Sequence, residues 1–211
     1  MKRLWIVGAG GFGREILSHA RDIQAAGQAD WEIAGFLDSR PAILDGFDIK
    51  PGLRGCVEAF RPGPDDRFIV AIGDPDARLR YARMLWEKGG RFETLIHPSA
   101  LIGERVTIGK GCFFGPLSGA TCDSRIGDFV IFNSKSGAGH DTVIGEGCTL
   151  AAFAEVTGRA RLGRCVSVGS HAVVLPGVHV EDGAEVFAGS VVARHAPRNA
   201  RVGGNPARRV A

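Results

Sequence analysis

The chain has 211 residues, of which 45% are hydrophobic, and its formal net charge is +3 at pH 7. A chain of this length folds as one large domain or two small ones, and its apolar content is sufficient to fill a core. The low net charge argues against a nucleic-acid or membrane surface. Five arginines nevertheless gather near the C-terminus, where they either face solvent or hold phosphate groups: Arg194, Arg198, Arg201, Arg208 and Arg209.

The N-terminus shows no signal-peptide pattern, because Met1-Lys2-Arg3 leads directly into a short apolar strand interrupted by glycines. No apolar run approaches the roughly 20 residues of a membrane helix. We therefore expect a cytoplasmic protein with no membrane insertion and no nucleic-acid partner. The five cysteines are odd in number and have no CxxC spacing, which argues against a disulfide framework and a zinc knuckle.

The first residues follow a strand, glycine turn, helix pattern. Residues 3–7 predict a short strand, and the residues after Gly13 predict an amphipathic helix with Ile16, Leu17, Ala20 and Ile23 on one face. Between them lies the glycine-rich segment Gly8-Ala9-Gly10-Gly11-Phe12-Gly13. Exposed N–H groups at the start of a helix suit phosphate oxygens, so this segment predicts a nucleotide site. The alternative is that the glycines only close a tight turn.

A further alternation of strands and helices completes a small α/β domain over residues 1–97. We predict strands at 32–37, 68–72 and 92–96 and a helix at 75–88. The strand at 32–37 ends at Asp38, whose carboxylate can accept hydrogen bonds from a ribose or a base. Only about half of a dinucleotide-binding fold fits into this length, which favours a mononucleotide end over NAD.

A repeat of six residues governs the rest of the chain. Steps of six from Ile102 to Val192 reach sixteen residues, all of them apolar, and a second series from Ala100 to Ser190 contains only small or β-branched residues. Six is a multiple of the strand period and not of the helix period, so each hexad predicts a short strand and a corner. We expect a parallel β-helix with the aliphatic series inside. Such a solenoid is either a scaffold alone or the carrier of a site.

Glycine often follows the large apolar residue of a hexad. We predict that these glycines form the corners and adopt a positive φ. They are Gly103, Gly109, Gly115, Gly127, Gly139, Gly145, Gly163 and Gly169.

Histidine can act as a base near neutral pH, and of six histidines His140 lies in the most open setting, among small residues of the segment 133–141. If three hexads make one coil, Gly158 stacks on His140 at about 4.8 Å. Its N–H could then face an oxyanion. Asp141 could orient the imidazole only if the chain turns there. Alternatively His140 is an ordinary surface residue, or Cys122, one coil below, is a nucleophile; cysteine fills small positions throughout the repeat, which disfavours the thiol.

Six segments together resemble the hexapeptide-repeat nucleotide-sugar acetyltransferases, a family that includes bacillosamine and perosamine N-acetyltransferases and sialic acid O-acetyltransferases. The segments are GAGGFGRE, FLDS, FIVAIGD, LIHPSALIGE, NSKSGAGHDTVIGE and GGNPAR. The resemblance implies an α/β Rossmann-like half-domain over residues 1–97 and an all-β left-handed parallel β-helix of hexapeptide repeats, three per coil, over residues 98–211. It also implies a nucleotide-sugar substrate, acetyl-CoA as co-substrate and a homotrimer.

The resemblance assigns site residues as well. It implies that His140 is the general base, with Asn133 and Asp141 beside it, and that Gly158 supplies the oxyanion N–H. Nucleotide-sugar binding falls on Gly8, Gly10, Phe12, Gly13, Asp38, Gly73 and Asn133. Contacts to CoA fall on Gly158, Ala188, Gly189, Gly204, Asn205 and Pro206. Some relatives have histidine where Phe12 stands, so a polar contact to the sugar is missing here.

Three other interpretations remain open at this point. One is O-acetylation of sialic acid or another sugar. A second is a hexapeptide-fold carbonic anhydrase, but no HxxxxH pair occurs and we expect no metal site. The third is a non-catalytic trimeric scaffold that binds a nucleotide.

Overall fold

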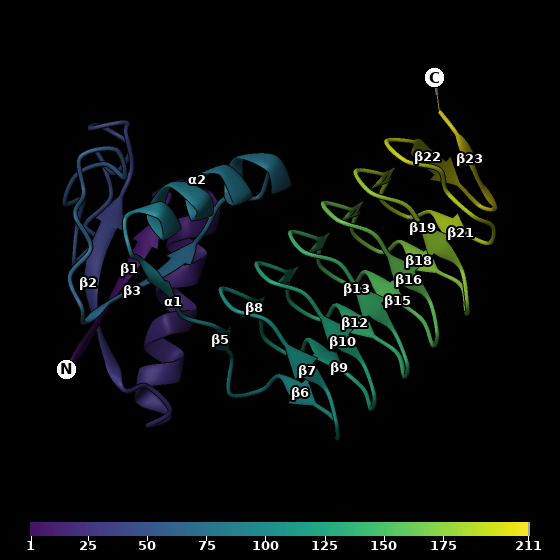
Figure 1. Cartoon of the computed structure of the whole chain (residues 1–211), viewed down its shortest axis with the longest axis horizontal. Helices are drawn as coiled ribbons and strands as arrows, with labels where there is room; N and C mark the ends of the chain where they lie inside the picture. The colour runs from purple at the N-terminus through teal and green to yellow at the C-terminus, as the bar shows by residue number, and fades with distance from the viewer. Residues whose placement is uncertain (211) are drawn as a thin grey trace. The chain divides into compact units, whose positions relative to one another are not determined.

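The computed structural model describes residues 1–210 and divides into two compact units, Met1–Pro98 and a second that begins at Ser99 (Figure 1). The first unit contains a parallel sheet in the order β2-β1-β3-β4, which confirms the predicted α/β class. Its strands are β1 (Lys2–Val7), β2 (Trp31–Leu37), β3 (Asp66–Val70) and β4 (Arg91–Phe92). Helices α1 (Gly11–Ala25) and α2 (Pro75–Glu87) follow β1 and β3 and pack against them.

The two helices form where the sequence pattern predicts them. In α1 the buried residues include all four of the predicted face, Ile16, Leu17, Ala20 and Ile23. In α2 the Asp74 side chain accepts a hydrogen bond from the Ala77 N–H at 2.7 Å, and Pro75 occupies the first turn, where its missing N–H costs no bond. Neither helix of the described chain is long and apolar enough to cross a membrane.

The predicted strands at 68–72 and 92–96 differ most from the structure. Strand β3 ends at Val70 rather than at residue 72, because the carbonyls of Ile72 and Gly73 accept hydrogen bonds from the buried guanidinium of Arg78 at 2.7 and 3.1 Å. The predicted strand 92–96 is divided into β4 and β5 (Leu95–Ile96), since only Arg91 and Phe92 pair with β3.

The second unit is a parallel β-helix of two-residue strands joined by corners, seen as stacked coils in Figure 1. One face consists of β6 (Leu101–Ile102), β9 (Gly119–Ala120), β12 (Gly137–Ala138), β15 (Glu155–Val156), β18 (Val173–Val174) and β21 (Val191–Val192). A second consists of β7 (Thr107–Ile108), β10 (Arg125–Ile126), β13 (Val143–Ile144), β16 (Arg161–Leu162) and β19 (His179–Val180). The third holds β8 (Phe113–Phe114), β11 (Ile131–Phe132), β14 (Thr149–Leu150), β17 (Ser167–Val168), β20 (Glu185–Val186), β22 (Arg201–Gly204) and the antiparallel β23 (Ala207–Arg209).

The register of the solenoid sets three hexads per coil. Gly137 pairs with Glu155, and Ile131 pairs with Thr149, so each residue stacks on the one eighteen positions later. The aliphatic series is buried from Phe114 to Val192, which confirms that it forms the core. Its first member, Ile102, is exposed because β6 is the terminal strand of its sheet.

The prediction of positive φ at the corner glycines is wrong. Positive φ occurs two residues later, at positions such as Phe129 (57°) and Asp141 (59°). The glycines instead allow close approach of the next coil: a Cβ on Gly127 would lie 2.7 Å from the Glu146 nitrogen, and one on Gly139 would lie 2.6 Å from the Gly158 nitrogen. No side chain fits at such distances.

We predict that Gly127→Ala destabilises the solenoid by about 1–3 kcal/mol, because the added methyl group would force the coils apart. The matched control is Gly177→Asn, since Gly177 has φ +71° and an added Cβ would meet no atom within 4 Å. Asparagine tolerates this conformation, so the control should change stability by less than about 1 kcal/mol. Urea denaturation measures both, and equal effects would contradict the close-approach explanation.

Candidate active site

The first unit contains a pocket of about 340 Å³ at the carboxyl ends of β1 and β2. Five of the predicted substrate-binding residues line it: Gly8, Gly10, Phe12, Asp38 and Gly73. Gly8 needs its glycine identity for φ +95°. Gly13 does not line the pocket, because its Cα packs on the Gly8 carbonyl, where a Cβ would collide. The glycine loop is therefore shaped by two distinct constraints, a left-handed turn and a close helix–strand contact.

Asp38 holds the glycine loop through hydrogen bonds of its own. Its side chain is only 5% exposed, and Oδ2 accepts a hydrogen bond from the Ala9 N–H at 2.9 Å. The Arg40 guanidinium donates to both carboxylate oxygens, at 2.9 and 2.8 Å. These bonds, Arg40 first, lower the pKa of Asp38 from 3.8 to about 2. Both oxygens thus serve the protein's own donors, whereas the sequence predicted acceptance from a ribose or base.

Sequence reasoning missed several residues of this pocket. Arg40 and Tyr81 line it, as do Val57 and Glu58 from the long segment between β2 and β3. Arg40 could have been found because it lies two residues after Asp38, the acidic residue that follows β2. Tyr81 could have been found because it is the only tyrosine of the chain. No sequence pattern marked the segment 38–65, which contains no strand or helix.

The second unit places His140 and Gly158 on adjacent coils at one corner. The imidazole lies against Gly158, since a Cβ there would be 2.5 Å from His140 Nε2. The chain turns at Asp141, and this brings the Asp141 Oδ2 within 2.7 Å of His140 Nδ1. Asp141 can therefore orient the imidazole, as expected if the chain turns at this residue. The imidazole is 51% exposed and remains accessible. A carboxylate partner on Nδ1 favours the tautomer with a lone pair on Nε2.

The Gly158 N–H is available at this corner. Among residues 1–210 no hydrogen bond uses it. At another corner the equivalent N–H groups of Lys110 and Arg164 are capped by Asp128 and Asp182 of the next coil, at 3.0 and 2.9 Å. Above Gly158 the equivalent residue is Pro176, which has no carboxylate to offer. A donor and a base are therefore exposed side by side, the combination that a reaction through an oxyanion requires.

Cys122 lies one coil below His140, as the eighteen-residue register predicts. The contact between these coils is made by the backbone, through a hydrogen bond from the Asp141 N–H to the Cys122 carbonyl at 3.2 Å. The cysteine is half-buried.

Asn133 does not lie beside His140 within one chain. Asn133 occupies the corner between β11 and β12, and His140 occupies the next corner, between β12 and β13, because seven residues span one strand and one corner. The predicted CoA residues divide in the same way. Ala188 and Gly189 follow β20 at the Asn133 type of corner, and the turn from Gly204 to Pro206 joins β22 to β23. The Gly204 N–H donates to Ser190 Oγ at 3.2 Å, which anchors the turn beside that corner.

Comparison with known proteins agrees with this two-part arrangement. Residues 3–85 match the model of the PglD N-terminal domain. Over its full length the chain resembles the crystal structure of PerB from Caulobacter crescentus in complex with CoA and GDP-perosamine, with a TM-score of 0.88, 28% identity and coverage of 100% of this chain and 98% of that one. The N-terminal unit thus matches a known domain family, and the whole chain is similar to a nucleotide-sugar N-acetyltransferase.

The chain is also similar in sequence to known acetyltransferases. It is 28% identical over 178 residues to the GDP-perosamine N-acetyltransferase of Escherichia coli O157:H7, which covers 82% of this chain and 78% of the relative. It is 37% identical over 84 residues to YvoF of Bacillus subtilis (strain 168), which covers 37% of this chain and 49% of the relative. The match to YvoF thus spans about half of that protein's length.

We predict that Asp38→Asn destabilises the first unit by about 1–3 kcal/mol at neutral pH, because an amide nitrogen would face Arg40 or the Ala9 N–H. The pKa of Asp38 is lowered from 3.8 to about 2, so the carboxylate stabilises the fold fully above pH 3.8 and progressively less as the pH falls toward 2. The difference in Tm between the two proteins should shrink over this range. A difference independent of pH would contradict the role given to the charge.

Proposed function

We propose that the chain is an acetyl-CoA-dependent N-acetyltransferase that acts on a nucleotide-linked amino sugar. The observation that carries the proposal is the pairing of the exposed His140 imidazole with the unused N–H of Gly158 on the next coil. Amide formation from a thioester needs a base for the amine proton and a donor for the carbonyl oxygen. The similarity to enzymes named as perosamine N-acetyltransferases supports an amino-sugar acceptor.

The proposed reaction is a direct transfer without an acyl-enzyme. The acceptor amine attacks the thioester carbonyl carbon, and His140 Nε2 removes a proton from the nitrogen as the C–N bond forms. The Gly158 N–H donates to the oxyanion of the tetrahedral intermediate. The C–S bond then breaks, and the imidazolium returns its proton to the departing CoA sulfur. Asp141 fixes the ring and stabilises its cationic form through Nδ1, at 2.7 Å.

The pocket of the first unit is proposed to hold the nucleotide. A volume of about 340 Å³ is at the small end of ligand pockets, which suits one nucleotide end better than a dinucleotide. The N-terminus of α1 begins at the glycine loop and has no side-chain cap, so its N–H groups can meet phosphate oxygens. Arg40 also lines the pocket, where its guanidinium is paired with Asp38.

A homotrimer follows as part of the same proposal. Within one chain, His140 and Gly158 lie at one corner, while Ala188, Gly189 and the Gly204–Pro206 turn belong to another. A CoA molecule that contacts both groups would bridge two copies. The resemblance to a family that builds its sites between subunits supports this arrangement.

The alternative of O-acetylation uses the same base and oxyanion donor on a hydroxyl group. The similarity to N-acetyltransferases favours the amine. A non-catalytic scaffold would have no need for the exposed imidazole or for the uncapped N–H of Gly158. Release of free thiol from acetyl-CoA, measured with UDP-, GDP- and dTDP-linked amino sugars and their hydroxy analogues, distinguishes these functions.

We predict that His140→Asn lowers kcat roughly 10²–10⁴-fold, the usual effect of removing a general base, with little change in the KM for the nucleotide-sugar. The matched control is His179→Asn on β19, an exposed histidine two coils beyond β13, which should keep its kcat. Thiol release measures both. An unimpaired His140→Asn enzyme would refute the assignment of the base.

We further predict that Gly10→Val weakens nucleotide binding by about tenfold, equivalent to about 1.4 kcal/mol, because the side chain would enter the pocket. The fold should accept the change, since the nearest atom to an added Cβ is Arg40 Nη2 at 3.8 Å. Calorimetry with GDP, UDP and dTDP gives the affinity, and thermal unfolding checks the fold. A stable variant with unchanged affinity would place the nucleotide elsewhere.

A further inference from the structure

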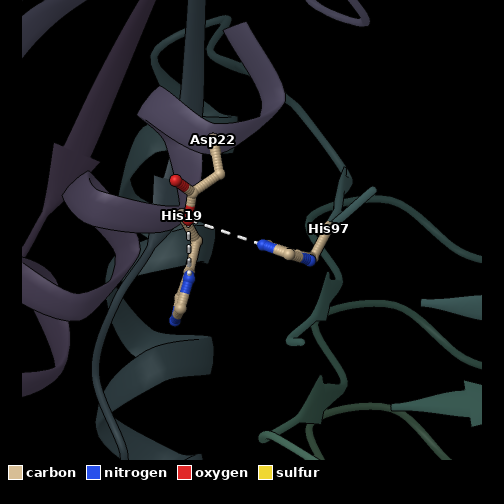
Figure 2. Close-up of side chains that lie close together, drawn as sticks. All are labelled: His19, Asp22 and His97. Carbon is tan, nitrogen blue, oxygen red and sulfur yellow. Dashed lines mark ion pairs between the residues drawn. The ribbon is translucent and has the colours of Figure 1, made fainter. Parts of the chain in front are cut away.

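A cluster of three potential metal ligands lies in the first unit, away from the nucleotide pocket. His19 and Asp22 are three residues apart on α1 and therefore share a face of the helix, and His97 follows the end of β5. Figure 2 shows the His97 ring directed toward the α1 residues. Sequence reasoning missed the cluster because His97 is distant from the other two along the chain and no HxxxxH or CxxC motif marks it.

The spacing of the three side chains fits a tetrahedral metal ion. Asp22 Oδ2 lies 3.5 Å from His19 Nδ1 and 3.4 Å from His97 Nε2. Both distances exceed the usual 2.7–3.2 Å or so of a hydrogen bond. They agree with the edge of about 3.3 Å that results when zinc is bound tetrahedrally at about 2.0–2.1 Å. All three ligand atoms lie within 4.8 Å of one another, so a small rotation of the rings would complete the set.

The surroundings of the cluster also suit a metal with one open position. The side chains of His19 and His97 are 20% and 14% exposed, while Asp22 is 51% exposed. One side of the cluster therefore faces solvent.

We propose that His19, Asp22 and His97 bind one divalent transition-metal ion, with Zn²⁺ as the best fit and water as its fourth ligand. Two imidazoles and one carboxylate are a common zinc-ligand combination, and softer or harder ions prefer thiolates or all-oxygen sites. The ion would connect α1 to the segment that follows β5. Its role is to stabilise the first unit, and it takes no part in acyl transfer.

The test uses the full-length protein after removal of metals with EDTA. Titration with Zn²⁺ against a chromophoric chelator should show one site per chain, and Zn²⁺ should raise the Tm. His97→Gln should weaken zinc binding by about 100-fold or more and abolish the rise in Tm, since even loss of an outer-shell partner can cost 10–100-fold. Co²⁺ should give the visible absorption of a tetrahedral site with the native protein and not with the variant.

The control is His179→Gln, which removes an exposed histidine that is close to His195 but outside the cluster. It should leave zinc binding intact. Asp22→Asn, at an exposed position, provides a second ligand variant in case His97→Gln folds poorly, as judged by circular dichroism. Absence of a stoichiometric site in the native protein, or equal binding by the native protein and both ligand variants, would overturn the proposal. None of these measurements depends on acetyl transfer.

Discussion

The proposed acyl-transfer site depends on one constraint, the parallel pairing of residues eighteen positions apart. At several corners the backbones of successive coils approach so closely that no Cβ would fit, as at Gly139. The same closeness brings Gly158 against the ring of His140. A side chain at Gly158 would displace the imidazole, and an aspartate on the coil above would cap its N–H. At this corner the bare Gly158 leaves room for the imidazole, and Pro176 on the coil above leaves the Gly158 N–H uncapped.

Both units expose backbone N–H groups that no protein acceptor caps. In the first, the glycine loop leaves N–H groups at the start of α1 uncapped, and Asp38 fixes the loop through Ala9 while it balances the charge of Arg40. In the second, the uncapped N–H of Gly158 is paired with a base. In both units an exposed backbone donor can therefore meet a ligand oxygen in place of a protein acceptor.

The elements with a strong period could be predicted from sequence. The six-residue series gave the core of the solenoid from Phe114 to Val192, and the helical spacing gave the buried face of α1. The conformation of the corner glycines could not be predicted in this way, because glycine permits both a positive φ and close backbone approach. The separation of Asn133 from His140, and the meeting of His97 with α1, depend on tertiary geometry that no local pattern encodes.

The most direct test is a crystal structure of the protein with CoA and a nucleotide-linked amino sugar. The account predicts that the CoA sulfur lies over Gly158 and that the amino group of the sugar is within hydrogen-bond distance of His140 Nε2. A complex with the sulfur at a different corner of the solenoid, and with His140 in contact only with solvent, would contradict it.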